Sequence, residues 1–339
     1  MASLLLGMGV LLMVSAAQAE LIVLAAPKSE DRYYADVIDE IYDFHVAFAR
    51  RIEGRDRVVV LTDREGYDDY VEALGPERVA VAPMEDIWMR DFGTANPDAP
   101  VMFRYSAEGQ GGGDNGQRDA DAVQEVLAVM AEKAGVRFQE SDLLNDGGNL
   151  VDDGDGRVVL SRKFLRDNRF NEEQGRAAVK RMTGARYVAF IEADEQGGLE
   201  HADGVVSFIG PNLLIVNSYP DDPDYRRKLH EDLQRGLPGV KIHEIVTPYD
   251  GNKIYDERFG SACGLYTNAL VTPHRIYLPQ FGIPDDHIAI EQLRSITDRE
   301  IVPVPAHQVC FMGGGVRCMS WQLRGRSADR LMDYLGRVR

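Results

Sequence analysis

The chain has 339 residues, with 38 lysines and arginines against 55 aspartates and glutamates, and its formal net charge is −17. This charge argues against nucleic acid or an anionic membrane as a partner and favours a cationic small molecule, although it would also keep an exported protein soluble. No Cys-x-x-Cys, His-Glu-x-x-His or Walker pattern occurs. A structural zinc site and a nucleotide phosphate site are therefore not indicated.

Residues 1–19 have the pattern of an export signal. Leu4 to Ala17 is an apolar run of fourteen residues, too short to cross a bilayer, and Ala17-Gln18-Ala19 has the small-x-small form of a signal-peptidase site. We expect residues 1–19 to be a cleaved signal peptide and residues 20–339 to form a single domain. The mature protein would be secreted or periplasmic, without membrane contact. Because no lysine or arginine precedes the apolar run, an uncleaved anchor is the alternative.

Strand and helix patterns alternate after residue 20, which predicts an α/β architecture. Helices are expected where apolar residues recur every third or fourth position, and strands where β-branched runs lie between turn signals. The predicted helices are 33–51, 67–74, 120–134, 171–183, 225–236 and 288–297. The predicted strands are 21–26, 58–61, 79–82, 101–105, 157–161, 187–191, 205–209, 213–217, 240–246, 269–272, 276–281 and 301–304.

Polar or glycine-rich turns open into strands at five places along the chain. The residues at these mouths are Asp91, Gly148, Asp203, Asn268 and Cys318, and they stand 57, 55, 65 and 50 residues apart. A regular spacing of this size is typical of radial repeats, in which each unit buries its face against the next. We therefore expect a five-bladed α/β propeller with the functional site at its centre.

If the five mouths converge, one pocket would hold a thiol, an imidazole, two carboxylates, an amide and an aromatic plane. These groups belong to Cys318, His201, Asp91, Asp203, Asn268 and Trp88. Two fixed carboxylates can hold a planar cation such as a guanidinium, and an aromatic face suits its plane. A thiolate could attack the central carbon while the imidazole protonates the leaving amine and later activates water. Such a reaction needs neither a metal nor an organic cofactor.

Five motifs carry these residues in order along the chain. They are Trp88-Met89-Arg90-Asp91-x-Gly93, Asp146-Gly147-Gly148-Asn149, His201-x-Asp203, Tyr266-x-Asn268 with Leu278-Pro279-Gln280-Phe281, and Gly313-Gly314-Gly315-x-x-Cys318. From about Leu21 to Leu323 the chain resembles the family of agmatine deiminases and bacterial-type (Porphyromonas-type) peptidylarginine deiminases. The resemblance implies a pentein fold, a five-bladed propeller of αββαβ units, as a deiminase catalytic domain over residues 20–339.

The resemblance also implies the reaction and the residue roles. A guanidino group would be hydrolysed to a ureido group and ammonia through a covalent thiouronium on Cys318, with His201 as general acid and base. Asp91 and Asp203 would hold the guanidinium, and Asn268 would support the thiol. Neither a metal nor a cofactor is implied.

The predicted substrate-binding residues are therefore Trp88, Asp91, Asp146, Asp203 and Asn268.

Three positions depart from the pattern of many agmatine deiminases. These have Glu-Gly-Gly where this chain has Asp146-Gly147-Gly148, Gly-His where it has Glu200-His201, and Ile-His-Cys where it has Val316-Arg317-Cys318. The departures leave the chemistry intact but bear on the choice of substrate.

The stretch after the first motif also bears on the substrate. In the secreted peptidylarginine deiminase that the chain partly resembles, a close pair of arginines there fixes the α-carboxylate of a C-terminal arginine, whereas residues 103–112 offer Arg104 and then Glu108. We therefore expect agmatine, whose amine Glu108 would favour, over free or peptidyl arginine. An export signal instead favours an arginine-containing peptide, because agmatine breakdown for putrescine synthesis is usually intracellular.

The three cysteines are an odd number, so at least one is free within the chain. We interpret Cys263 and Cys310 as buried apolar side chains, although Cys310 could cap Cys318 by oxidation. Two other functions are alternatives. A non-catalytic secreted binding protein for cationic amines or arginine peptides would use the same carboxylates without Cys318, and a metal-dependent ureohydrolase would need clustered His and Asp ligands.

Overall fold

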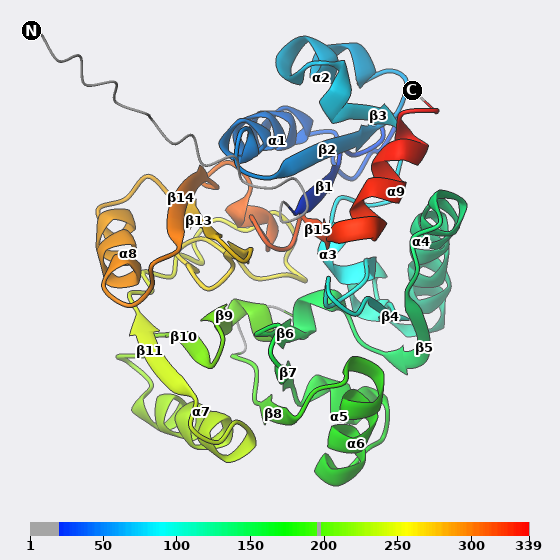
Figure 1. Cartoon of the computed structure of the whole chain (residues 1–339). Helices are drawn as coiled ribbons and strands as arrows, with labels where there is room; N and C mark the ends of the chain where they lie inside the picture. Colours follow the sequence, from blue (N-terminus) through cyan, green and yellow to red (C-terminus); the bar gives the residue numbers. More distant parts are fainter. Residues whose placement is uncertain (1–19, 195–197, 339) are drawn as a thin grey trace, which may run out of the picture.

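The computed structural model describes residues 20–194 and 198–338 and has a mixed α/β fold (Figure 1). The predicted signal peptide, residues 1–19, lies outside the described residues. Five small sheets follow one another around the molecule in chain order, and most helices lie on their outer side (Figure 1). Among the helices of the described ranges, none is long and apolar enough to cross a membrane.

The first sheet brings the two ends of the described chain together. Its strands are β1 (Leu21–Ala25), β2 (Arg57–Thr62), β3 (Val79–Val81) and β15 (Trp321–Leu323), in the order β15-β1-β2-β3. β2 pairs in parallel with β1 and β3, whereas β15 pairs antiparallel with β1. The loop that carries Cys318 is thereby fixed to a sheet whose other strands come from the N-terminal part of the chain.

Three further sheets share one pattern, an antiparallel hairpin followed by a helix and a parallel strand. Their strands are β6 (Val151–Asp152), β7 (Arg157–Ser161) and β8 (Tyr187–Ile191); β9 (Val206–Gly210), β10 (Leu213–Asn217) and β11 (Lys241–Ile245); and β12 (Leu270–Val271), β13 (Arg275–Gln280) and β14 (Glu300–Pro305). The fifth sheet pairs β4 (Val101–Arg104) in parallel with β5 (Gln139–Leu144). The predicted succession of hairpin, helix and strand is confirmed. Across the described ranges the five sheets remain separate and none closes on itself.

Nine α-helices occur in the described ranges. They are α1 (Ile38–Ile52), α2 (Tyr67–Leu74), α3 (Met89–Phe92), α4 (Gly113–Ala134), α5 (Lys163–Asp167), α6 (Glu172–Thr183), α7 (Pro223–Gly236), α8 (Asp285–Arg294) and α9 (Gly325–Leu335). The predicted helix 33–51 begins only at Ile38, because the preceding residues form turns in which Asp31 accepts a hydrogen bond from the Tyr33 amide. α4 and α8 begin earlier than predicted, since their first turns are polar and the apolar periodicity starts later.

The helices bury their apolar faces on the sheets. Phe48 of α1 is fully buried with its ring 5.7 Å from that of Tyr277 in β13, and α7 packs Leu229 and Leu233 against Ala189 in β8. Burying one such side chain contributes roughly 1.5–3 kcal/mol. The loops that carry polar residues between strands are therefore held by a rigid scaffold.

Trp321, the first residue of β15, lies in the core. Its ring is fully buried, and Nε1 donates a hydrogen bond of 2.8 Å to Thr94.

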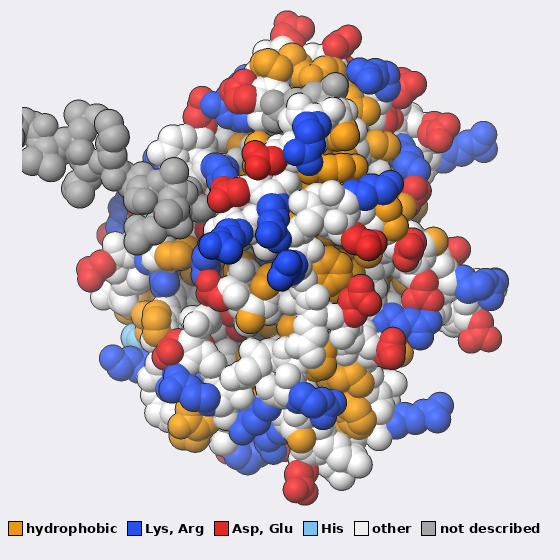
Figure 2. Space-filling model, turned by 45° about the vertical axis from the view of Figure 1, so that its right-hand side comes forward, with side chains coloured by type: hydrophobic (Ala, Val, Ile, Leu, Met, Phe, Trp, Pro, Cys, Tyr) orange, Lys and Arg blue, Asp and Glu red, His pale blue; other side chains and the backbone are white. Residues whose placement is uncertain are grey.

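The surface charge is distributed unevenly in spite of the net charge of −17. On the face drawn in Figure 2, lysine and arginine side chains gather near the middle, among scattered acidic ones.

Candidate active site

The loops that precede the inner strands converge on one cavity of about 290 Å³. Its lining includes Trp88, Asp91, His201, Asp203, Asn268 and Cys318. These side chains come from α3 and the residue before it, from the 3₁₀ turn Ala202–Gly204 and the residue before it, and from the loops before β12 and β15. Every predicted site residue except Asp146 thus lies on this cavity, which has the size of a small-molecule site.

The thiol of Cys318 is buried between an amide and a carboxylate. Asn268 donates a hydrogen bond of 3.0 Å from Nδ2 to Sγ, and Sγ lies 3.9 Å from Oδ2 of Asp203. Burial raises the pKa of the Cys318 thiol well above its usual value, and the charges of Asp203 and Asp91 raise it further against the hydrogen bonds of Asn268 and Gly315. The resting side chain is therefore a neutral thiol, and a bound cation would favour the thiolate.

His201 is surrounded by carboxylates. Its Nε2 lies 2.9 Å from Oδ2 of Asp146, and its Nδ1 lies 3.7 Å from Oδ1 of Asp91. Burial lowers the pKa of His201, but Asp91, Asp146 and Asp203 outweigh it and raise the pKa to about 9. For Asp91 the effect of burial has the opposite sign, because the charged form is the deprotonated one. Burial raises the pKa of Asp91 to about 7, against the charge of His201, which lowers it. At neutral pH the imidazole is therefore charged and can donate a proton.

Asp146 lies behind His201 and does not line the cavity. Its carboxylate accepts hydrogen bonds of 2.8 Å from both the amide and the hydroxyl of Ser106. The structure therefore places Asp146 against the imidazole of His201 and not on the cavity lining, where its predicted contact with the substrate would require it. The reason is the 3₁₀ turn Gly147–Asn149, which begins directly after Asp146 and presents the Gly148 amide to Asp91 at 3.2 Å.

Two glycines leave room for the side chains of the site. A Cβ on Gly148 would lie 2.5 Å from Nδ1 of His201 and 2.8 Å from Oδ1 of Asp91. A Cβ on Gly314 would lie 2.3 Å from a ring carbon of Trp88. Both glycine motifs therefore serve the close approach of functional side chains to the backbone.

Carboxylates dominate the outer part of the cavity. The acidic lining residues there are Asp31, Glu85, Asp86, Asp194 and Glu200. Among the described residues that line the cavity, Arg258 alone is a lysine or arginine, and its guanidinium is held by Asp256 at 2.6 and 3.0 Å. Glu85 is paired with Lys28 at 2.6 Å and Glu200 with Arg166, so part of this negative charge is neutralised, but the lining remains acidic on balance.

The prediction that Glu108 attracts the substrate amine is wrong. Its carboxylate lies 3.0 Å from Nζ of Lys163, and Glu108 does not line the cavity. Arg104 points elsewhere too, since it makes an exposed ion pair with Asp121 at 2.7 Å. The partner of each residue lies in a different segment, which the local sequence does not reveal.

Arg317 is a residue of the site that the sequence prediction left without a role. Its Nη1 lies 2.5 Å from Oδ2 of Asp203, and its Nη2 donates a hydrogen bond of 2.8 Å to the carbonyl of Leu150. The signal that could have revealed it is the departure at Val316-Arg317-Cys318, where an arginine precedes the thiol. Separately, no group of three or more His, Cys, Asp or Glu side chains suited to a metal ion occurs within residues 20–194 and 198–338.

Comparison with known proteins matches residues 13–323 to the Porphyromonas-type peptidyl-arginine deiminase family. The chain belongs to this family. It is 26% identical over 319 residues to the agmatine deiminase of Stutzerimonas stutzeri, which covers 81% of this chain and 85% of that protein. Membership makes the protein a hydrolase of C–N bonds in guanidino groups.

Two solved structures have the same fold. The agmatine deiminase of Enterococcus faecalis has a TM-score of 0.72 at 19% identity, over 92% of this chain and 95% of that chain. An agmatine deiminase of C. jejuni with substrate bound has a TM-score of 0.73 at 17% identity, over 91% of this chain and 95% of that chain.

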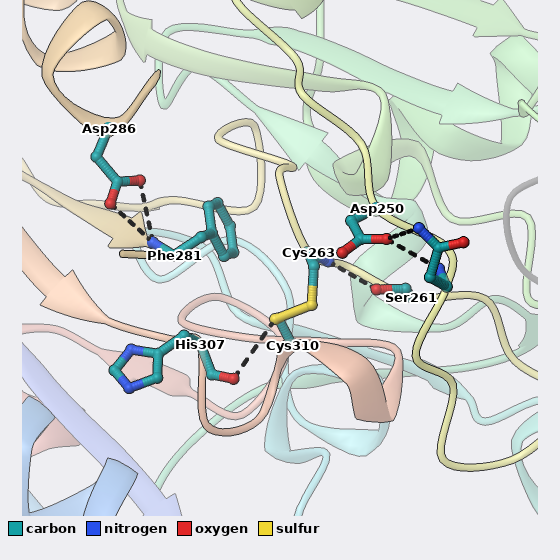
Figure 3. Close-up of a disulfide and its surroundings, with 8 residues drawn as sticks. Asp250, Ser261, Cys263, Phe281, Asp286, His307 and Cys310 are labelled. Carbon is teal, nitrogen blue, oxygen red and sulfur yellow. Dashed lines mark hydrogen bonds between the residues drawn. A yellow bond between two sulfur atoms is a disulfide. The ribbon is translucent and has the colours of Figure 1, made fainter. Parts of the chain in front are cut away.

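In this member of the deiminase family, Cys263 and Cys310 form a disulfide across a sequence separation of 47 residues (Figure 3). The interpretation of Cys310 as a buried side chain is confirmed, whereas the pairing of the two cysteines was not predicted. Because of the disulfide, Cys310 is not available to cap Cys318, which is free and buried. The disulfide joins two segments that line the cavity, Phe259–Ala262 on one side and Met312–Gly313 on the other. Ala262 also donates a hydrogen bond of 2.8 Å to the carbonyl of Cys310.

Replacing both Cys263 and Cys310 by alanine is expected to lower the free energy of unfolding by about 2–4 kcal/mol, as for other disulfides that close long loops. KM should rise as well, because both joined segments line the cavity. Urea unfolding of the variant and of the oxidised and reduced wild type measures the first effect. Equal unfolding midpoints for the variant and the oxidised protein would contradict the prediction.

Gly148→Ala is expected to lower kcat/KM of this deiminase by about a hundredfold, because the added methyl group must displace His201 or Asp91. The matched control is Gly204→Ala in the neighbouring turn, where a Cβ meets no atom within 4 Å. Steady-state kinetics and thermal unfolding of both variants provide the measurement. If the two variants were equally active, close approach at Gly148 would not be required.

Proposed function

We propose that the protein converts agmatine or a similar guanidinoalkylamine to its ureido product and ammonia through a covalent thiouronium on Cys318. The observation that carries this proposal is the shared cavity, in which the thiol lies beside Asp203, with Asp91 and a charged His201 on the same lining. Membership of the deiminase family supports the reaction type.

The first half of the reaction forms the thiouronium. Asp91 and Asp203 bind the guanidinium, whose charge favours loss of the Cys318 proton to solvent. The thiolate then adds to the central carbon, and His201 gives a proton to one amino group as its C–N bond breaks. Ammonia leaves, and the carbon remains bonded to Sγ.

The second half releases the product. Neutral His201 takes a proton from water, and the oxygen adds to the thiouronium carbon. The C–S bond then breaks, the hydroxyl proton passes to the sulfur, and the ureido product leaves. The net change consumes one water and releases ammonium, so neither a metal nor a cofactor is needed.

We also infer that the five sheets are the blades of a pentein-type propeller. Their order around the molecule and the repeated hairpin, helix and strand support this arrangement. So does the way that turns from successive units bring Asp91, Asp203, Asn268 and Cys318 to one cavity.

The acidic outer cavity supports a dicationic substrate. The amine of agmatine would lie among carboxylates, whereas the α-carboxylate of arginine would meet repulsion. Among the described residues that line the cavity, its one lysine or arginine partner would be Arg258, which Asp256 already holds. Asp86 is the buried acid of this region. Its two oxygens accept hydrogen bonds of 2.6 Å from Tyr34 and 2.7 Å from Gln110.

We expect kcat/KM for agmatine to exceed that for free arginine and for a peptide ending in arginine by tenfold or more, about 1.4 kcal/mol of transition-state binding. Assays of ureido product over a panel of guanidino compounds measure this. Preference for the peptide, lost in Arg258→Gln, would instead support a peptidylarginine deiminase that reads the terminal carboxylate. Failure to release ammonia from any compound would support a non-catalytic binding protein.

We further propose that the protein is exported and acts outside the cytoplasm. The signal pattern of residues 1–19 supports this, as does the disulfide, because such bonds persist in oxidising compartments. Fractionation of the native host tests it, and recovery of full-length protein in the cytoplasm would overturn it.

A further inference from the structure

Asp203 lies between two cavities and is held by Arg317. Its carboxylate lies on the catalytic cavity, whereas Arg317 lines a separate cavity of about 200 Å³ and reaches Oδ2 from there. The side chains are nearly buried, with exposed fractions of 2% for Asp203 and 11% for Arg317. Because the second nitrogen of Arg317 donates to the carbonyl of Leu150, the guanidinium is fixed at two points.

The two oxygens of Asp203 have different surroundings. Oδ2 carries the ion pair with Arg317 and the contact with Cys318, whereas Oδ1 makes no hydrogen bond with any residue in the ranges 20–194 and 198–338. Arg317 also donates its backbone amide to the carbonyl of Asn268 at 3.2 Å. Arg317 therefore links the carboxylate of Asp203, the backbone of Asn268 and the thiol of Cys318, which is the next residue in the chain.

We infer that Arg317 is a positioning residue that holds the Asp203 carboxylate turned so that one oxygen is left for the substrate guanidinium. This inference rests on the proposed function. Without the guanidinium of Arg317, the Asp203 carboxylate would lose both the contact that fixes its direction and the counter-charge that offsets the neighbouring acids.

The charges around Asp203 explain why one more cation is needed. Asp91 and Arg90 face it from α3, His201 stands two residues before it, and Cys318 follows Arg317 in the last loop. Reaction turns the thiol into an anion, and His201 gives up its proton. Arg317 is the nearby cation whose charge does not change during the reaction and whose nitrogen touches the carboxylate.

Agmatine binding to Cys318→Ser, with and without Arg317→Gln, tests the inference by calorimetry between pH 6 and 9. We expect Arg317→Gln to weaken binding at least tenfold at pH 7, because the Asp203 carboxylate is no longer held in place. In the active enzyme the change should appear mainly in KM. Arg317→Lys, which keeps the charge, should restore most of the affinity at pH 7.

A matched control separates this role from general stability. Arg299 lines the same second cavity but donates to the carbonyls of Pro273 and Ile209, so Arg299→Gln should leave agmatine affinity unchanged. An Arg317→Gln variant whose affinity is unchanged, or an Arg317→Lys variant that binds agmatine no better than Arg317→Gln, would overturn the inference. Absence of turnover in the wild type would instead overturn the proposed function, while the binding measurements would still decide the role of Arg317.

Discussion

Replacing Cys318 by serine is expected to lower kcat by roughly 10⁴-fold or more while leaving the fold intact, as losses at covalent nucleophiles generally do. Serine keeps the size of the side chain and the contact with Asn268, but its hydroxyl is a far weaker nucleophile between the two carboxylates. Steady-state kinetics with agmatine and thermal unfolding together measure the effect. The variant should still bind agmatine, because Asp91 and Asp203 are unchanged.

The structure supplies a control for this prediction. Cys263 and Cys310 are tied up in their disulfide, so Cys318 is the free thiol of the described chain. Iodoacetamide should therefore inactivate the enzyme by modifying Cys318 alone, and mass spectrometry of the alkylated protein would identify the site. A serine variant that kept more than about a hundredth of the wild-type kcat would rule out the covalent route.

The sequence was sufficient to bring Asp91, His201, Asp203 and Cys318 to one cavity, because each follows a repeated turn signal before a short buried strand. The strand and helix order was predictable for the same reason, since burial imposes a period on the residues. The first residues of several helices were less predictable. α4 and α8 begin in polar turns that carry no periodicity, and the helix predicted from residue 33 begins only at Ile38.

The parts of the site that the sequence did not predict depend on the direction of side chains and on distant partners. Asp146 contacts His201 on the side away from the cavity, because the backbone of the following 3₁₀ turn sets the direction of its side chain. Glu108 does not have its predicted role, because its carboxylate is paired with Lys163, 55 residues away in the chain. The pairing of Cys263 with Cys310 likewise depends on two loops meeting in space.

His201→Gln is expected to lower kcat by about 10²–10⁴-fold, the usual contribution of a general acid or base. In the wild type, kcat/KM should fall on the alkaline side near pH 9, because His201, whose pKa is about 9, loses the proton that the leaving ammonia needs. It should fall on the acid side near pH 7, because Asp91, whose pKa is about 7, gains a proton and no longer holds the guanidinium. The glutamine variant should lack the alkaline fall.

Asp146→Asn provides the matched variant, because it keeps an oxygen near Nε2 and removes the charge. Since Asp146 helps to raise the pKa of His201, its loss should move the alkaline fall to lower pH while the acid fall changes less. Profiles of kcat/KM from pH 5 to 10 for the wild type and both variants provide the measurement. An alkaline fall that persisted at the same pH in His201→Gln would assign that limb to another group, and the imidazole would then not be the proton donor.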